Sequence, residues 1–320
     1  MHRSYPLFLL FAAMSFSSSI SGQADSVTLE TPNGLLYGTL LLPEGTEQPI
    51  PLVILHVGSG PTDRDGNQPR FKMNTHRMLA EGLAENGIAS LRFDKRGVAA
   101  SSGALTSEAD LRFEDYVSDL EGWIERFQDD ERFSTITVAG HSEGSLIGML
   151  ATRAQRAVDA FISIAGPARP AADILRKQFA GQPPMIKDMV YPILDSLEQG
   201  NTVSEVNPMI AAMFRASVQP YMISWFQYDP SEIIAQQEVP VLIVQGTTDI
   251  QVPEEEAQTL AAAAGDKAKL SYFSNMNHAL KTCESMEQSD QLSTYMNPEL
   301  QLHEGLIRRL VVFINKVKKN

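Results

Sequence analysis

The sequence predicts an α/β protein with a doubly wound, mostly parallel sheet, an antiparallel N-terminal hairpin and a helical cap insertion. Short, almost continuously apolar runs such as "PLVILHV", "STITVAG" and "AFISIAG" alternate with helical patterns, which is typical of parallel strands buried on both faces. Two earlier runs, "SVTLET" and "LLYGTLLLPEG", are separated by Pro32, Asn33 and Gly34, a signal for an antiparallel hairpin. Between Pro167 and about Gln237 the alternation stops and helical sequence takes over.

The remaining elements follow the same alternation along the chain. After the hairpin, we expect strands over residues 51–57, 88–93, 134–140, 160–166, 239–246 and 268–273. We expect helices near residues 72–86, 109–128, from about 143, after 253 and over about 298–317. Residues 26–166 and 238–320 are therefore predicted to form the α/β core, and residues 167–237 to form a cap inserted between two of its strands.

The predicted cap is rich in large apolar side chains. They are Phe179, Met185, Met189, Tyr191, Met209, Met213, Phe214, Tyr221, Met222, Trp225 and Phe226. Met and aromatic residues suit an adaptable apolar binding pocket, but the same residues also suit the cap's own core. Both alternatives stay open on the sequence.

Composition and charge exclude several classes of protein. The 320 residues are 43% hydrophobic and 20% charged, which is ordinary for a globular chain. A formal net charge of -13 argues against nucleic acid as a partner, because phosphate-binding surfaces need clustered Lys and Arg. Cys283 is the only cysteine, so no internal disulfide can form, and a structural zinc site is not expected. We predict neither a metal nor a cofactor.

The first 21 residues are predicted to be a signal peptide. Arg3 precedes an apolar run over residues 5–16, and small residues follow it. This layout is typical of a secretory signal, and the apolar part is shorter than a membrane-spanning helix requires. We place cleavage after Ser21, with Gly22 and Ala24 as alternatives, and an uncleaved membrane anchor is the competing interpretation. The mature protein is expected to be secreted or periplasmic, without stable membrane insertion.

Ser142 is the candidate nucleophile. It stands in "TITVAGHSEGSLIGMLA", where a β-branched run meets Gly-His-Ser-Glu-Gly and an apolar helical pattern follows. Gly140 and Gly144 permit a tight turn from strand to helix. The hydroxyl would then lie near the helix N-terminus, where partial positive charge favours a developing anion. The alternative interpretation is a Gly-rich turn without a catalytic role.

A serine hydroxyl needs a base, most often a histidine that a carboxylate orients. Of the six histidines, His278 lies in "SNMNHALK" after the last expected strand, at the sheet edge where ligands bind. His303 falls inside an expected helix, and the side chain of His141 is expected to point away from Ser142. Asp249, in "VQGTTDIQVP" directly beyond a strand, has the chain order that this architecture requires. A surface histidine and a solvated loop aspartate are the competing interpretations.

Two backbone N–H groups are expected to stabilise the oxyanion of a tetrahedral intermediate. One belongs to Glu143, directly after the candidate nucleophile, and the other to Ser59 in the loop "HVGSGPTDRDGN". Gly58 and Gly60 would let this backbone approach a substrate closely. The alternative is a turn with no ligand role, and a phosphate-binding loop is not supported because its lysine is missing.

Taken together, the order Ser142, Asp249, His278 and the motifs "GHSEG", "GSGPTDRDG", "LRFDKRGVAASSG" and "MNHALK" resemble the α/β-hydrolase superfamily. The resemblance is to its bacterial secreted esterases related to serine aminopeptidases and dienelactone hydrolases, over roughly residues 26–318. It implies the α/β-hydrolase fold and a Ser-His-Asp hydrolase of carboxylic esters. Dienelactone hydrolases carry cysteine where this chain has Ser142, and Ala99 stands where relatives often have glycine.

We therefore expect a cofactor-independent serine hydrolase that cleaves a small-molecule ester through an acyl-enzyme intermediate. Ser142 would attack, His278 would act as the base, and Asp249 would hold the imidazole tautomer. No oligomeric state is predicted.

Two alternatives remain. A serine aminopeptidase would need acidic groups in the pocket to hold a substrate ammonium. The cap offers six candidates, Asp188, Asp195, Glu198, Glu205, Asp229 and Glu232. The second alternative is a catalytically silent periplasmic binding protein on the same fold.

Overall fold

One sheet organises the residues that the computed structural model describes, which are 22–47 and 49–319. Its strands lie in the order β1-β2-β4-β3-β5-β6-β7-β8. Their bounds are β1 Gly22–Thr31, β2 Gly34–Pro43, β3 Ile50–His56, β4 Ala89–Phe93, β5 Phe133–His141, β6 Ala160–Ile164, β7 Val241–Gly246 and β8 Ala268–Phe273. β1 pairs antiparallel with β2, and β2 with β4, whereas the pairs from β4 through β8 are parallel. The predicted hairpin and mostly parallel sheet are confirmed.

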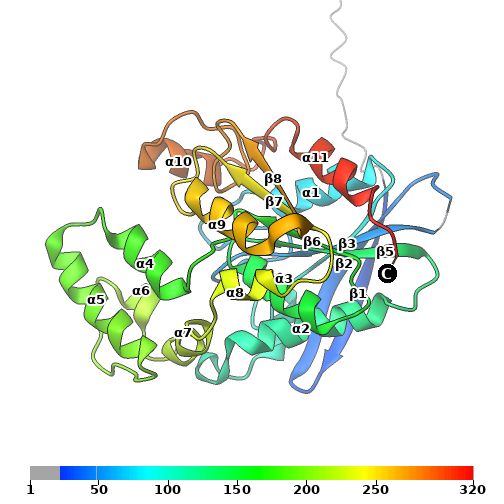
Figure 1. Cartoon of the computed structure of the whole chain (residues 1–320). Helices are drawn as coiled ribbons and strands as arrows, with labels where there is room; N and C mark the ends of the chain where they lie inside the picture. Colours follow the sequence, from blue (N-terminus) through cyan, green and yellow to red (C-terminus); the bar gives the residue numbers. More distant parts are fainter. Residues whose placement is uncertain (1–21, 48, 320) are drawn as a thin grey trace, which may run out of the picture.

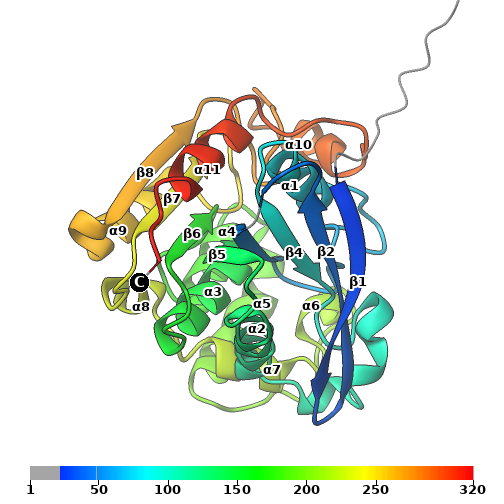
Figure 2. The same ribbon diagram turned by 90° about the vertical axis from the view of Figure 1, so that its right-hand side faces the viewer.

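Helices cover both faces of the sheet. Their bounds are α1 Thr75–Ala84, α2 Phe113–Phe127, α3 Glu143–Ala154, α4 Ala171–Phe179, α5 Pro184–Glu198, α6 Ala211–Phe214, α7 Gln219–Trp225, α8 Pro230–Ala235, α9 Glu254–Ala264, α10 Gln288–Tyr295 and α11 Leu306–Ile314. Three short 3-10 turns are η1 Ala99–Ala104, η2 Glu108–Asp110 and η3 Gly265–Lys267. α1 and α11 pack on one face, and α2, α3 and α9 pack on the other (Figure 2). The doubly wound arrangement is therefore confirmed.

Helical spacing of apolar residues explains why these helices pack as they do. The buried apolar residues of α2 are Phe113, Tyr116, Leu120, Trp123, Ile124 and Phe127, and their spacing of three and four residues forms one stripe. Trp123 of this stripe is fully buried in the same core cluster as Phe161 of β6. On the opposite face, Leu79 and Leu83 of α1 share a core cluster with Leu310 of α11.

The helices between β6 and β7 extend beyond the sheet. α4, α5 and α6 stand to one side of it in Figure 1, and their apolar side chains, with Phe214 and Leu194 buried, form part of the same core cluster as α2 and α3. α8 packs against α3 and α9. The N–H of Ser231 donates a hydrogen bond to the carbonyl of Ala168 at 3.1 Å, so the two ends of this excursion meet. We use the word cap for residues 167–237 as an interpretation of this arrangement.

The predicted C-terminal helix is too long, and one helix was not expected. The last helix begins at Leu306 rather than near residue 298, and α10 precedes it. The reason is that residues 301–303 pair with the loop after β8. Lys281 and Leu302 form a β-bridge, and the N–H of His303 donates to the carbonyl of Leu280 at 2.8 Å. His303 therefore lies outside the helix in which it was expected.

The predicted signal peptide, residues 1–21, lies outside the described residues. β1 begins at Gly22. Among the residues that are described, no helix combines the length and the apolar character needed to cross a membrane.

Glu256 of α9 anchors the start of the cap. Its side chain is fully buried, and Oε2 accepts hydrogen bonds from the N–H groups of Ala168 at 2.9 Å and Arg169 at 3.2 Å. Oε1 forms an ion pair with the Arg169 guanidinium at 2.8 Å. One carboxylate thus satisfies two backbone donors at the point where the chain leaves the sheet.

We expect Glu256→Ala to lower the free energy of unfolding by about 1–3 kcal/mol, because two backbone N–H groups lose their acceptor. Urea denaturation measures the change. Glu255→Ala is the matched control, since Glu255 is 64% exposed and forms only a 3.7 Å surface pair with Lys177; it should change stability by less than about 1 kcal/mol. Equal effects of the two variants would contradict the anchoring role.

Candidate active site

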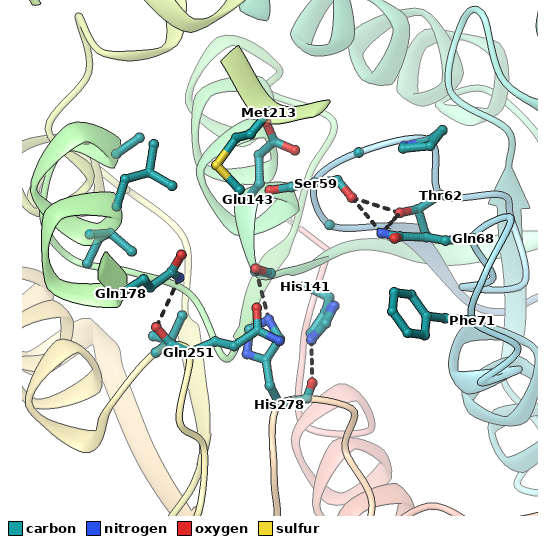
Figure 3. Close-up of a pocket in the computed structure, with 18 of the residues that line it drawn as sticks. Ser59, Thr62, Gln68, Phe71, His141, Glu143, Gln178, Met213, Gln251 and His278 are labelled. Carbon is teal, nitrogen blue, oxygen red and sulfur yellow. Dashed lines mark hydrogen bonds between the residues drawn. The ribbon is translucent and has the colours of Figure 1, made fainter. Parts of the chain in front are cut away.

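A cavity of about 760 Å³ lies between the carboxyl edge of the sheet and the cap. Its lining comes from the loop after β3, the turn after β5, helices α4, α6 and α7, and the loops after β7 and β8. Ser142, His278 and Ser59 all line this one cavity. Figure 3 shows His278, His141 and Gln251 at one side of it, with Met213 and Glu143 across from them. Segments far apart in the sequence therefore meet here.

Ser142 occupies a sharp turn between β5 and α3. Its backbone has φ 56° and ψ -125°, a conformation that costs a non-glycine residue about 1–3 kcal/mol. The neighbouring glycines make the turn possible. A Cβ added to Gly140 would lie 2.0 Å from the carbonyl oxygen of Gly144, and one added to Gly144 would lie 2.4 Å from the carbonyl oxygen of Val57. Any side chain at either position would push α3 away from the sheet.

His278 and Asp249 extend from Ser142 as a chain of hydrogen bonds. His278 Nε2 lies 3.0 Å from Ser142 Oγ, and His278 Nδ1 lies 2.7 Å from Asp249 Oδ2. The Asp249 side chain is completely buried, and its Oδ1 accepts hydrogen bonds from the N–H groups of Gln251 at 2.8 Å and Val252 at 2.9 Å. These bonds hold the carboxylate so that His278 donates from Nδ1 and presents Nε2 to the serine.

The backbone around Ser59 and Glu143 supplies donors beside Ser142. Glu143 is the first residue of α3, and the first N–H groups of a helix have no partner within it. Within residues 22–47 and 49–319, neither the Ser59 nor the Glu143 N–H donates to a protein acceptor. The loop approaches closely, because a Cβ added to Gly58 would lie 3.1 Å from Ser142 Cβ. Two unpaired N–H groups thus belong to residues that line the cavity with Ser142.

His141 contacts His278, which the sequence analysis did not anticipate. Its Nε2 lies 2.9 Å from the His278 carbonyl oxygen, and the centroids of the two imidazole rings are 4.8 Å apart (Figure 3). Burial, with His278 and His76 nearby, lowers the pKa of His141 well below its usual 6.5, and burial lowers the pKa of His76 to about 4. His141 is therefore neutral at pH 7. Because a carbonyl only accepts, its proton lies on Nε2.

A buried polar cluster lies behind the turn that carries Ser142. The Glu143 side chain is 2% exposed and accepts a hydrogen bond from the Tyr221 hydroxyl of α7. Burial, and then the Glu143 carboxylate, raise the pKa of Tyr221 well above its usual 10, so this hydroxyl stays protonated. The buried Lys95 Nζ lies 3.9 Å from Glu143 Oε2. Sequence reasoning missed this pairing, although "DKRG" directly after a strand was a possible signal.

The large apolar residues of the cap divide between the two roles left open. Met213, Tyr221, Met222 and Trp225 line the cavity. Phe214, Phe226, Met189, Tyr191 and Phe179 belong to the core cluster or pack against it, and Met185 and Met209 are exposed. Tyr221 and Met222 line the cavity and also belong to the core cluster, so the two alternatives overlap.

The six acidic candidates from the cap do not line the described cavity, and neither does Asp173, the seventh acidic residue of the cap. Asp195 and Glu198 form ion pairs with Arg176, and Asp229 accepts from the N–H of Ser231 at the start of α8. Among the described residues, Glu143 is the only carboxylate in the lining; it accepts a hydrogen bond from Tyr221 and lies 3.9 Å from Lys95 Nζ. Arg215 also lines the cavity, and it pairs with Glu108. Both charged side chains of the described lining therefore have partners of opposite charge.

Sequence comparison relates the chain to known hydrolases. A family model described as serine aminopeptidase, S33, matches residues 72–233, which is just over half of the 320 residues. The esterase EstD of Thermotoga maritima is 26% identical over 262 residues, which cover 78% of this chain. The chain spans only 59% of the length of that relative.

Solved structures share the fold at low sequence identity. Est1E from Butyrivibrio proteoclasticus superposes with a TM-score of 0.61 at 19% identity, covering 92% of this chain and 99% of that one. The α/β hydrolase GrgF from Penicillium sp. sh18 has a TM-score of 0.62 at 18% identity, with the same two coverages. Together with the sheet order, the turn at Ser142 and the extent of the family match, these findings show that the chain belongs to the serine aminopeptidase S33 family of the α/β-hydrolase superfamily.

Proposed function

We propose that the protein is a serine esterase that hydrolyses uncharged carboxylic esters through an acyl-enzyme intermediate. The observation that carries this proposal is the chain of hydrogen bonds from Ser142 through His278 to Asp249, at the floor of an apolar cavity. A serine, a histidine and a buried carboxylate in this order are the recurrent machinery of acyl transfer. The name of the relative EstD, an esterase, supports the same reaction class.

Acylation uses the three side chains and the two free N–H groups. His278 Nε2 takes the proton of the Ser142 hydroxyl as Oγ bonds to the ester carbonyl carbon. The carbonyl oxygen becomes an oxyanion, which accepts hydrogen bonds from the N–H groups of Ser59 and Glu143. When the intermediate collapses, the bond from carbon to the alcohol oxygen breaks, and this oxygen takes the proton from His278 Nε2. Asp249 stays ionised and holds the imidazolium.

Deacylation repeats these steps with water as the nucleophile. His278 Nε2 takes a proton from the water, whose oxygen bonds to the acyl carbon and forms a second oxyanion in the same N–H groups. The bond to Ser142 Oγ then breaks, Oγ recovers its proton from His278, and the carboxylic acid leaves. Every step uses only side chains and backbone groups described above, together with substrate and water.

The charge of the cavity favours an ester over an aminopeptidase substrate. A substrate ammonium that leaves water needs a paired carboxylate, because an unpaired buried charge is strongly unfavourable. Glu143, the one carboxylate that residues 22–47 and 49–319 contribute to the lining, already accepts from Tyr221 and lies near Lys95. We therefore propose that the acyl part of the substrate is apolar and uncharged, in keeping with the Met and Trp side chains of the lining.

We also propose that the chain is exported with removal of residues 1–21, so that the esterase works in the periplasm or outside the cell. The apolar run behind Arg3 and the small residues before Gly22 support this.

A fluorophosphonate should form a stoichiometric covalent adduct with the protein, visible as one mass increment. Ser142→Ala should give no adduct, and His278→Ala should react at least about a thousandfold more slowly, because the serine loses its base.

Asp249→Asn should lower kcat by roughly 10³–10⁴, since the amide favours the wrong imidazole tautomer. Asp266→Asn, in an exposed turn, is the matched control and should match the parent. A folded parent without adduct would sink the proposal and favour a silent binding protein.

A propionyl ester should be hydrolysed with a kcat/KM at least about tenfold higher than the alanyl ester of the same alcohol, because only the alanyl group brings an ammonium into the cavity. Both esters are measured at pH 6, where the alanyl amine is protonated, so that their rates differ through its charge. Hydrolysis of an alanyl arylamide is measured alongside, to show how far the rate depends on the leaving group. Preference for the alanyl ester, with rapid arylamide cleavage, would instead establish an aminopeptidase.

Expression of the full chain with N-terminal sequencing tests export. The protein recovered from the periplasm should begin at Gly22, or at Gln23 or Asp25 if cleavage follows Gly22 or Ala24 instead. Recovery from the membrane fraction with Met1 retained would instead support the uncleaved anchor.

A further inference from the structure

Lys95 is a buried cation that the proposed mechanism does not use. It follows the end of β4 by two residues, and its side chain is 1% exposed. It is not part of the cavity lining. Burial lowers the pKa of Lys95, and the nearby Glu143 carboxylate opposes this effect. Because burying an ammonium costs several kcal/mol without good partners, the partners of Lys95 indicate what holds it there.

Two of those partners belong to the segments that carry the proposed oxyanion donors. Lys95 Nζ donates a hydrogen bond to the carbonyl oxygen of Gly58 at 2.8 Å, and Gly58 forms a peptide with Ser59. The same Nζ lies 3.9 Å from Glu143 Oε2 and 4.9 Å from the centre of the Tyr116 ring. One ammonium thus joins the loop after β3 to the first residue of α3.

Peptide geometry connects the Gly58 carbonyl with the Ser59 N–H. The two groups share one planar unit and point in opposite directions, so a donor that fixes the carbonyl oxygen also fixes the direction of the N–H. Gly58 packs against Ser142, with only 3.1 Å between an added Cβ and Ser142 Cβ. A charged donor also polarises the peptide group and strengthens its N–H as a donor.

The next carbonyl is held as well. The Ser59 carbonyl oxygen accepts from Thr62 Oγ1 at 2.8 Å and from Gln68 Nε2 at 3.0 Å (Figure 3). Thr62 and Gln68 belong to the same loop as Ser59, whereas Lys95 belongs to a different strand end. Asp94 and Arg92 also hold this loop, through Arg64 and Asp65, but Lys95 is the contact from outside the loop at the Gly58 carbonyl itself.

We propose that Lys95 is a positioning residue for ester hydrolysis, which aims the Ser59 N–H at the oxyanion by holding the Gly58 carbonyl while Glu143 balances its charge. The proposal rests on the proposed function, because it assigns Lys95 a role in the same oxyanion site. Loss of this role affects the tetrahedral state more than the bound ester, since the oxyanion exists only after attack.

The test compares Lys95→Met with the parent in three measurements. Titration with a fluorophosphonate gives the concentration of reactive Ser142 sites. Dividing the rate of ester hydrolysis by this concentration removes the contribution of misfolded protein. For each titrated site, we expect kcat for a short-chain ester to fall by about 10–100-fold, while KM changes less than about threefold. The inhibition constant of a trifluoromethyl ketone, which forms a tetrahedral adduct on Ser142, should rise by a similar factor to the fall in kcat.

Lys267→Met is the matched control. Lys267 Nζ also donates to a backbone carbonyl, but this carbonyl belongs to Gln237, which neither lines the cavity nor precedes a proposed oxyanion donor. This variant should keep the parental kcat, KM and inhibition constant. A kcat per site within twofold of the parent in Lys95→Met, or a loss confined to KM, would overturn the proposal and leave the esterase assignment intact. Failure of the parent itself to react would overturn both.

If Lys95→Met does not fold, Lys95→Ala with added n-propylammonium replaces it, because the amine can occupy the space of the missing side chain. We expect propylammonium to raise kcat at least about fivefold in a saturable manner, and n-propanol at equal concentration to have less effect, since it lacks the charge. Equal rescue by both compounds, or recovery of folded protein without recovery of kcat, would show that Lys95 only fills space.

Discussion

The close packing where β3, β5 and α3 meet is the constraint on which the rest of the site depends. Ser142 keeps its strained φ of 56° only because no side chain separates Gly140 from Gly144, or Gly144 from the end of β3. This contact brings the N-terminus of α3 and the loop after β3 to the same point. The hydroxyl and the two N–H groups therefore lie beside one another, and His278 reaches them from the loop after β8.

The distribution of charge is as informative as the geometry. Two buried ionic groups beside the turn at Ser142, Lys95 and Glu143, are paired with each other, with a tyrosine hydroxyl and with a backbone carbonyl. The cavity in front of them is lined mainly by apolar side chains. A low-dielectric cavity with fixed dipoles behind it strengthens every interaction with a charge that develops during reaction. It also disfavours a substrate that brings its own charge. The same arrangement therefore supports both the proposed reaction and its expected selectivity.

Much of this organisation is predictable from the sequence because it depends on local patterns. Parallel strands buried on both faces produce continuous apolar runs. Loops that follow the parallel strands, among them those with Asp249 and His278, lie at one edge of the sheet. The missed features depend on long-range contacts. Lys95 and Gly58 are separated by 37 positions in the sequence, and Tyr221 and Glu143 by 78. α11 begins only at Leu306 because the residues before it pair with the loop after β8. No periodicity in the chain encodes those contacts.

The meeting of Ala168 with Ser231 has a consequence for how this scaffold can evolve. An excursion whose two ends touch closes a loop without straining the strands below it, and the entropy of closing a longer loop rises only slowly with length. Insertions, deletions or exchange of the segment between these two residues would therefore leave the registration of β6 and β7 undisturbed. New lining residues can be sampled in that segment while Ser142, His278 and Asp249, which all lie outside it, are inherited unchanged.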